Sequence, residues 1–446
     1  MRKEAVETQE APKVSTASET AQLILNGTKT NLPVTVGTEQ EKGMDITRLR
    51  DATGVVTLDP GFANTASCLS AITYLNGEQG ILRYRGFPIE ELAEYGTYSE
   101  VAYLLIYGNL PSRRELEQFT SRLAERANLP EGMERVFDCF PKGTHPMAVL
   151  SAAVAALSGY SPELLNSTPT REEIDAIILT LLARVPTIAA YGYRRKNGLP
   201  AIPPKSGLSP TANFLYMLFG PSGADGNPDE TIVSAFRQIL ILHADHEQNC
   251  STSTVRLVGS SRANAFVSIA SGIGALWGPL HGGANQAVIE MLEQIHQAGG
   301  DFSKYLGMAK DKTSGFRLMG FGHRVYKNFD PRAKILKAAC DRVLGKLGIH
   351  DPLLDLAKRL EEAALRDDYF VSRKLYPNVD FYSGIILRAI GIPTDQFTVI
   401  FALGRLAGWL AHWKEMLESP GFRISRPRQI YVGSNQRRYV PLSQRS

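Results

Sequence analysis

Two histidines, His243 and His246, end the stretch from Thr231 to Asn249. Apolar residues precede them at steps of three or four, namely Ile232, Phe236 and Ile239. This spacing predicts one helix with both imidazoles on its buried face. Two such histidines can bind a metal, but a metal site needs a third ligand, and spacing assigns none. The alternative is that each imidazole hydrogen-bonds to its neighbours or to a bound anion.

His281 lies in the Gly-rich run Trp277–Asn285, directly before a helical pattern over Gln286–Gln294. The positive end of that helix should depress the pKa of His281 and keep its imidazole neutral. A neutral imidazole can donate a hydrogen bond to a developing oxyanion, and the flanking glycines let a ligand approach closely. The alternative is a histidine that caps its own helix.

The run Met319–Arg332 ends in a helix start, with Asp330 as the cap and Pro331 at the first helical position. Arg332 in the first turn opposes the helix dipole, which indicates that a ligand anion is its partner. The loop Gly320-Phe-Gly322 exposes backbone groups that could read a flat ring. His323 at the end of this loop could act as an acid.

Asp380 lies between apolar residues after a proline break at Pro377. Desolvation raises a carboxyl pKa toward the range of a useful general base. The alternative is that Asn378 or Asp380 merely caps the helix that follows.

Arg405 is the only Lys, Arg, Asp or Glu between Phe397 and Trp413, in an otherwise apolar helical run. A lone guanidinium on such a helix needs an anionic partner, because an unpaired buried charge costs several kcal/mol. Gly404 and Gly408 make room beside it. Arg426, in the run Ser-Arg-Pro-Arg-Gln, is a second candidate for binding carboxylates.

The elements that must position these residues are mostly helices. Residues 1–18 look like a disordered lead, and short β-prone runs over residues 20–60 predict a small β unit with strands at 23–25, 34–36 and 55–58. After residue 60, apolar spacing predicts helices that include Tyr98–Tyr107, Arg113–Ala127, Met147–Leu157, Arg171–Ala183 and Leu353–Ala364. No strand–helix alternation supports a parallel sheet, and neither G-x-G sequence supports dinucleotide binding.

Composition excludes several classes of protein. The formal charge is only +4, from 49 basic and 45 acidic residues, which gives no argument for nucleic acid binding. The uncharged stretch Ala263–Ile289 is too broken by Gly and Pro for a membrane span. The four cysteines form no CxxC, and we expect Cys250 to be a buried structural thiol in a reduced, cytoplasmic protein.

Six motifs in order then identify a resemblance. They are Ile72–Gly77 with Tyr84–Pro88, His243-Ala-Asp-His-Glu-Gln-Asn249, Gly278-Pro-Leu-His-Gly-Gly-Ala-Asn285, Gly320-Phe-Gly-His-Arg-Val-Tyr326, Pro377-Asn-Val-Asp-Phe381 and Arg426-Pro-Arg-Gln429. With these motifs the chain resembles the citrate synthase family, in its bacterial form, from about residue 20 to residue 437. The resemblance implies a mainly all-α fold with a large helical domain at 61–289 and 393–446. It also implies a small helical domain at 290–392 that closes over the substrates, and a β unit at 19–60.

The resemblance also implies roles. Asp380 would take a proton from the acetyl methyl of acetyl-CoA, His281 would stabilise the enol, and His323 would be the acid toward oxaloacetate. The implied oxaloacetate-binding residues are His243, His246, Arg332, Arg405 and, from a neighbouring subunit, Arg426. The implied CoA-binding residues are Leu318, Met319, Gly320, Phe321, Gly322 and Lys327. No metal and no cofactor beyond the CoA thioester substrate is expected.

Several alternatives stay open at this point. A 2-methylcitrate synthase would use propionyl-CoA in the same fold, and a catalytically inactive helical scaffold would keep the fold alone. A metallohydrolase would rest on His243 and His246 only. At least a homodimer is implied, with a hexamer as the alternative. NADH regulation is not expected, because Gly207–Asp245 lacks the cysteine that accompanies it in some bacterial relatives.

Overall fold

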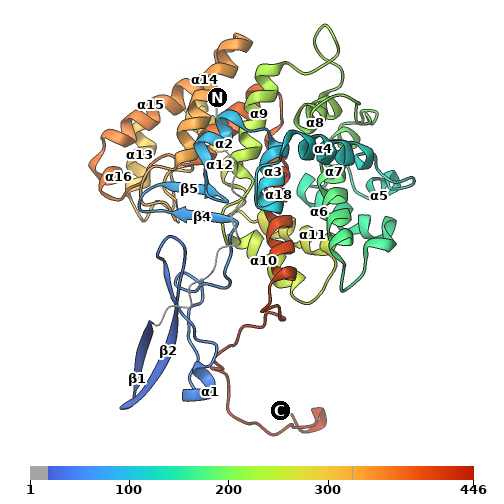
Figure 1. The fold of residues 1–446 in the computed structure, drawn as a ribbon. Coiled ribbons are helices and arrows are strands. Elements are labelled where there is room, and N and C mark those ends of the chain that lie inside the picture. Colours follow the sequence, from blue (N-terminus) through green and yellow to red (C-terminus); the bar gives the residue numbers. More distant parts are fainter. Residues whose placement is uncertain (1–18, 324, 446) are drawn as a thin grey trace, which may run out of the picture. The chain divides into compact units, whose positions relative to one another are not determined.

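The computed structural model describes residues 19–323 and 325–445, so the predicted disordered lead at 1–18 lies outside the described residues. The chain forms two compact units, one from the residues up to Leu69 with those from Ser425 on, and one from Ser70–Ile424. The described chain is mainly helical, as predicted, with only two small sheets (Figure 1). The predicted division of the helical part at residues 290–392 stays a prediction.

The first unit is built on a β-hairpin. Strands β1 (Thr20–Leu25) and β2 (Thr28–Val36) pair antiparallel across Asn26 and Gly27. Both turn residues have positive φ, at 49° and 81°, which is the twist that a two-residue hairpin loop requires. The sequence therefore predicted these two strands and their turn correctly.

The third predicted strand, at residues 55–58, is wrong. The strand that pairs with β2 is β3 (Lys42–Met44), and α1 (Leu49–Thr53) follows it. Val55 and Leu58 are exposed, with no strand beside them among the described residues, so their β propensity is not realised. A short 3-10 helix, η4 (Leu442–Gln444), lies near the C-terminus of the same unit.

The second unit begins with a three-stranded antiparallel sheet and continues almost entirely in helices. Its elements are β4 (Thr73–Asn76), β5 (Ile81–Tyr84), β6 (Phe87–Pro88), α2 (Ile89–Tyr95), α3 (Tyr98–Tyr107), α4 (Arg113–Arg126), α5 (Glu134–Asp138), α6 (Pro146–Ala156), η1 (Leu157–Tyr160), η2 (Pro162–Leu164), α7 (Arg171–Lys196), α8 (Pro210–Phe219), α9 (Glu230–His243), α10 (Cys250–Gly259), α11 (Ala265–Leu276), α12 (Ala284–Gln297), α13 (Ser303–Lys310), α14 (Pro331–Leu347), α15 (Pro352–Arg366), α16 (Asp368–Ser372), α17 (Val379–Ala389), η3 (Thr394–Gln396) and α18 (Phe397–Glu418).

The predicted helices are present, and their starts follow local capping. Helices α3, α4 and α7 each begin with a capping box, in which a Ser or Thr and a Glu satisfy each other's backbone amides. Helix α7 continues beyond the predicted end, through Pro186 to Lys196. It is the one described helix long and apolar enough to cross a membrane, and 72% of its most apolar window is buried inside the structure.

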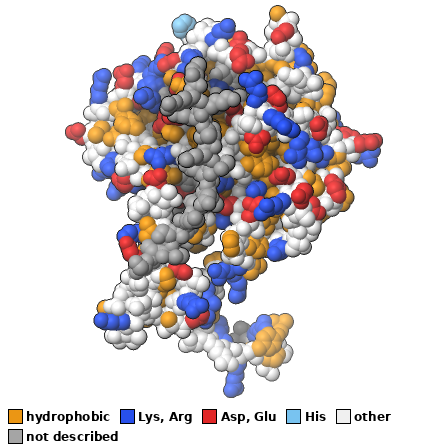
Figure 2. All heavy atoms as spheres, viewed as in Figure 1, with side chains coloured by type: hydrophobic (Ala, Val, Ile, Leu, Met, Phe, Trp, Pro, Cys, Tyr) orange, Lys and Arg blue, Asp and Glu red, His pale blue; other side chains and the backbone are white. Residues whose placement is uncertain are grey.

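Helix α18 lies at the centre of the second unit, where it packs against α3, α9, α10 and α11 (Figure 1). Every residue from Phe397 to Trp413 is buried. On the face drawn in Figure 2, basic and acidic side chains are interspersed over the helices, in keeping with the small net charge. Any charged side chain in this stretch of α18 is therefore surrounded by apolar residues and shielded from water.

Candidate active site

Arg405 on α18 is almost fully buried, with 1% of its surface exposed. Its Nε donates to the carbonyl of His243 at 2.7 Å, but its Nη1 is buried without a hydrogen-bond partner. Burial lowers the pKa of Arg405 to about 10, against the opposing effect of Asp245. An added Cβ at Gly404 would come within 3.0 Å of the Leu240 carbonyl, so a glycine is needed for this close approach. The guanidinium keeps a capacity to bind an anion that no described protein group satisfies.

The His-x-x-His segment is not one helix face, so that prediction is wrong. Helix α9 ends at His243, and His246 lies in the connection to α10. The helix stops because the backbone carbonyl and amide of Asp245 hydrogen-bond to the Tyr84 hydroxyl. Glu247, with a φ of 55°, then turns the chain. Both imidazoles are nevertheless buried, as predicted.

The two histidines of this segment are neutral. His243 Nδ1 donates to the Ile239 carbonyl at 2.7 Å, and the Nε2 atoms of His243 and His246 are buried without partners. Burial, then the charge of Arg332, lowers the pKa of His243 to about 3 and that of His246 well below its usual value. Among residues 19–323 and 325–445, no group of three or more His, Cys, Asp or Glu side chains could hold a metal.

His281 does not cap its own helix, because α12 begins after Gly283 as its N-cap. Its Nε2 lies 2.9 Å from the Ser251 hydroxyl and accepts from the Ser251 amide at 3.3 Å, at the start of α10. An Nε2 that accepts leaves the proton on Nδ1, which is then the donor. Burial, followed by Arg405, lowers the pKa of His281 to about 4. The imidazole is neutral, as predicted, but the main cause of its lowered pKa is burial and not the dipole of α12.

His323 is held as the opposite tautomer. Its Nδ1 accepts from the amides of Val325 at 3.0 Å and Tyr326 at 3.2 Å. The proton is therefore on Nε2. Its ring lies 5.2 Å from that of His246 and 4.9 Å from that of Tyr326, between centroids. Burial, then Arg332, lowers the pKa of His323 to about 4.

Arg332 already has a protein partner, Asp330, which was not predicted from the sequence. Asp330 caps α14 through the Arg332 amide, as predicted, and it also binds the Arg332 guanidinium with two hydrogen bonds of 2.9 Å. Burial alone would lower the pKa of Arg332, but Asp330 raises it above its ordinary value. Asp330 Oδ2 also accepts from the amide of Val379, the first residue of α17, at 3.0 Å. This carboxylate thus connects the guanidinium to the helix that carries Asp380.

Asp380 is not the cap of α17, because the Asn378 side chain accepts from the Asp380 amide at 3.0 Å. The Asp380 Oδ1 is inaccessible and has no hydrogen-bond partner. Burial raises the pKa of Asp380 to about 6, although Arg332 and Arg405 oppose the shift. A desolvated carboxylate with a pKa near neutrality is suited to removing a proton.

These residues form one electrostatic group, which we call the arginine–histidine cluster; its members are His243, His246, His281, His323, Arg332, Asp380 and Arg405. Both guanidinium groups act on the pKa values of His243, His246 and Asp380. Arg332 also acts on His323, and Arg405 acts on His281. The cluster combines two anion-binding guanidinium groups, four neutral imidazoles, of which His281 and His323 are opposite tautomers, and one basic carboxylate.

The predicted CoA loop is tied to the start of α17. Gly320 and Gly322 have positive φ, and an added Cβ at Gly320 would lie 2.9 Å from the Phe381 ring. The Gly322 amide donates to the Tyr376 carbonyl, and the Asn378 amide donates to the Gly320 carbonyl. Of the other predicted CoA residues, Leu318 is buried, Met319 and Phe321 are half-buried, and Lys327 is exposed.

Some predicted residues lie elsewhere, and some contributors were missed. Arg426 belongs to the first compact unit and is exposed there. Cys250 is exposed, so its prediction as a buried thiol is wrong; it occupies the first position of α10, beyond the cap residue Asn249. Ser251 and Tyr326 were missed. No spacing pattern marks Ser251, because it contacts His281 only through tertiary packing. Tyr326 lies three residues after His323 and donates its amide to that ring, so it could have been found from its place in the same loop.

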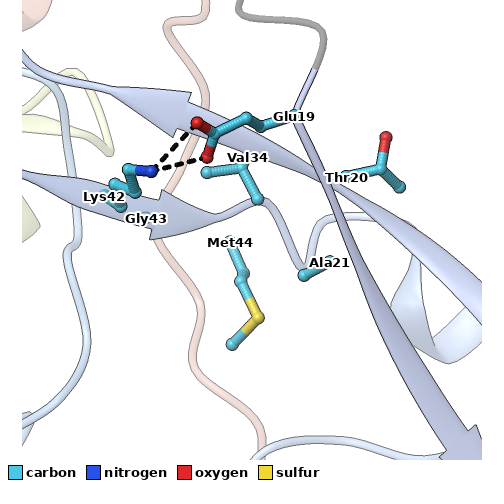
Figure 3. Close-up of a pocket in the computed structure, with 7 residues that line it drawn as sticks. All are labelled: Glu19, Thr20, Ala21, Val34, Lys42, Gly43 and Met44. Carbon is cyan, nitrogen blue, oxygen red and sulfur yellow. Dashed lines mark hydrogen bonds and ion pairs between the residues drawn. The ribbon is translucent and has the colours of Figure 1, made fainter.

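Two open surface pockets lie apart from the cluster. One, of about 300 Å³, is lined by Glu19, Thr20, Lys42 and uncharged residues of the first unit, with the Glu19–Lys42 ion pair across it (Figure 3). The other, of about 470 Å³, is lined by residues of α3, α4 and α7, including Tyr103 and Asp175. Neither contains a residue of the arginine–histidine cluster.

Comparison with known proteins gives one consistent result. Residues 61–428 match the family described as citrate synthase, C-terminal domain. Citrate synthase 1 of Mycobacterium tuberculosis is 53% identical over 427 residues, which cover 96% of this chain and 99% of the relative. The citrate synthase of Corynebacterium glutamicum is 50% identical over 434 residues, covering 97% and 99%.

Solved structures agree with the sequence comparisons. The crystal structure of citrate synthase from Pyrobaculum aerophilum has a TM-score of 0.79 at 40% identity, covering 88% of this chain and 98% of that one. A ternary complex of citrate synthase from Thermoplasma acidophilum with carboxymethyl coenzyme A and oxaloacetate has a TM-score of 0.79 at 31% identity, covering 87% and 100%. On the fold, the cluster and these matches, the chain belongs to the citrate synthase family of enzymes.

Proposed function

We propose that this enzyme condenses acetyl-CoA with oxaloacetate and hydrolyses the resulting citryl-CoA to citrate and CoA. Membership of the citrate synthase family supports the reaction, and a relative binds a CoA analogue together with oxaloacetate. The observation that carries the proposal is Asp380, a desolvated carboxylate with an unpaired oxygen and a pKa near 6, beside two guanidinium groups. The reaction needs no metal and no cofactor besides its thioester substrate.

Oxaloacetate carries two carboxylates, and the cluster offers cationic and neutral donors for them. Arg405 binds one carboxylate through the Nη1 that lacks a protein partner. Arg332, His246 and His243 complete the site on this chain. The neutral His246 ring adds an N–H donor without adding charge, whereas the proton of His243 is held by the Ile239 carbonyl, which leaves His243 a supporting role. Arg426 reaches the substrate from a neighbouring subunit, which makes at least a homodimer the working form.

Asp380 begins the reaction by removing a proton from the acetyl methyl group. A thioester α-proton is a weak acid, so the base must act together with a donor at the thioester oxygen. His281 is that donor, since its Nε2 faces Ser251 and its Nδ1 carries the proton. A neutral imidazole stabilises the enol oxygen with a hydrogen bond and does not compete with Asp380 for the proton.

The enol carbon then attacks the carbonyl carbon of oxaloacetate. His323 polarises that carbonyl through its Nε2–H and supplies the proton to the developing alkoxide. Water hydrolyses the thioester of the condensed product and releases CoA. Carbon–carbon bond formation in competition with water requires a closed site, and residues 290–392 are the domain that closes.

CoA is held by the loop Leu318–Gly322, whose backbone reads the adenine, and by Lys327 at a phosphate. The loop is rigid enough for this task because the neighbouring segment at Tyr376–Asn378 fixes Gly320 and Gly322. The enzyme works in the cytoplasm.

Thiol release with paired substrates tests the proposal. Purified protein with oxaloacetate should release CoA from acetyl-CoA much faster than from propionyl-CoA, and Asp380→Ala should abolish release. Release from propionyl-CoA alone would move the assignment to 2-methylcitrate synthesis. Release from neither substrate would leave a helical scaffold without the activity.

A further inference from the structure

One face of α18 hydrogen-bonds to the end of α9 and to the segment that follows it. Arg405 donates to the carbonyl of His243, and the Gly408 amide donates to the carbonyl of Ala244 at 3.1 Å. One turn after Arg405, the Trp409 indole donates to the Ser251 hydroxyl at 3.2 Å. These contacts recur at the three- and four-residue spacing of one helix face. The same face ends in a residue that the proposed mechanism does not use, His412.

His412 and Asp245 form a buried pair, with 1% and 0% of their surfaces exposed. His412 Nε2 lies 3.3 Å from Asp245 Oδ1 and 3.4 Å from Oδ2. The Thr73 hydroxyl on β4 donates to the same carboxylate at 2.6 Å. Burial alone would raise the pKa of Asp245, but His412, Arg405 and Thr73 hold it below its ordinary value. Asp245 is thus an ionised carboxylate in the interior that depends on its donors.

The other side of the His412 ring fixes its orientation. The Gln248 amide nitrogen lies 3.3 Å from His412 Nδ1, and an Arg256 guanidinium nitrogen lies 3.5 Å from it. Both of these groups can only donate, so Nδ1 accepts and the ring proton is on Nε2. His412 therefore donates to Asp245 through Nε2. Arg256 has its own anion, because it also pairs with Glu415 at 3.2 Å.

The Asp245 carboxylate holds a strained turn. It accepts from the Glu247 amide at 3.1 Å, and Glu247 has a φ of 55°, which a residue with a Cβ adopts at a cost. The Tyr84 hydroxyl holds the backbone of Asp245 as well. His246 lies between the anchored Asp245 and the strained Glu247, and its ring contacts those of His323 and Tyr326. The position of the His246 ring follows from the position of this turn.

We propose that His412 is a positioning residue for oxaloacetate binding: through Asp245 it locks the turn at residues 244–249 and thereby places His246. This inference rests on the proposed function, in which His246 binds oxaloacetate. His412 makes the last of the contacts along the face of α18 that begins with Arg405. Losing its hydrogen bond should weaken oxaloacetate binding and leave acetyl-CoA binding nearly intact.

Steady-state kinetics of three variants test the proposal. His412→Leu removes the donor at similar volume and should raise KM for oxaloacetate about tenfold or more, the effect of one lost hydrogen bond to a charged group. KM for acetyl-CoA should change less than about twofold. His412→Gln places an amide N–H where Nε2 was and should restore most of the affinity. Met416→Ala, at a buried position near the C-terminal end of the same helix, should lower the melting temperature without changing KM for oxaloacetate.

An unchanged KM for oxaloacetate in a destabilised His412→Leu variant would overturn the proposal, because the pair would then serve only folding. Failure of His412→Gln to recover affinity would also overturn it. If His412→Leu does not fold, Thr73→Val removes another donor to Asp245 and should raise the same KM. A wild-type protein that releases no CoA defeats the proposed function instead, and titration calorimetry of oxaloacetate with His412→Leu and wild type then decides the role of the pair.

Discussion

Replacing Asp380 by asparagine should stabilise the protein while it removes the activity. Burial raises the pKa of Asp380 from 3.8 to about 6 in the folded state. The folded state therefore binds this proton more tightly than the unfolded chain does, and the free energy of unfolding falls as pH rises from about 4 to about 6. Above that range the ionised carboxylate costs the folded state about 3 kcal/mol, at about 1.36 kcal/mol per pKa unit.

Thermal melting at two pH values measures this effect. Asparagine has the same shape and no charge, so it removes the cost. For a chain of 446 residues, 3 kcal/mol corresponds to a melting temperature about 3 °C higher at about pH 7.5. At about pH 5 wild-type Asp380 is largely protonated when folded, and roughly half of the gain should remain. CoA release by the variant should be lost at both pH values.

Glu117→Gln is a matched control, because it makes the same change from carboxylate to amide on the exposed surface of α4. It should leave both the melting temperature and the activity unchanged. A lower melting temperature for Asp380→Asn at about pH 7.5 would refute the reasoning, as would a gain that does not shrink at about pH 5. Either result would mean that the carboxylate is not held with a raised pKa.

Three further predictions follow from the cluster. Wild-type kcat/KM should fall below about pH 6 with unit slope as Asp380 takes up its proton; a profile that is flat down to about pH 5 would contradict this base. Arg405→Gln should raise KM for oxaloacetate about 100-fold, since truncating one partner of a buried charge pair costs about 2–5 kcal/mol, and an unchanged KM would remove Arg405 from the site. His281→Ala should lower kcat by about 10²–10³ as an oxyanion donor does, and a loss under about tenfold would argue against that role.

The sequence predicted the site best where local composition leaves few options. A single charged residue in a long apolar helix can only be buried, so the burial of Arg405 follows from its neighbours. The caps of α14 at Asp330 and of α17 at Asn378 also follow from local rules. At α17, Asn378 takes the capping role, which leaves the Asp380 carboxylate for chemistry.

The rest depends on contacts between segments far apart in the chain. The end of α9 at His243 is set by Tyr84, more than 150 positions away, and no local signal marks it. The tautomer of His281 is set by Ser251 on α10, and the neutral state of the histidines in the cluster comes mainly from burial. The run at 55–58 fails for the opposite reason, because its β propensity finds no partner strand.

Release of CoA from acetyl-CoA, followed with a thiol reagent in the presence and absence of oxaloacetate, tests the central claim most directly. The wild-type protein should release CoA only when oxaloacetate is present, and Asp380→Asn should reduce kcat by at least about 10³ while it remains folded. Undiminished release by Asp380→Asn would contradict the account, because a base other than Asp380 would then have to remove the proton from the acetyl methyl group.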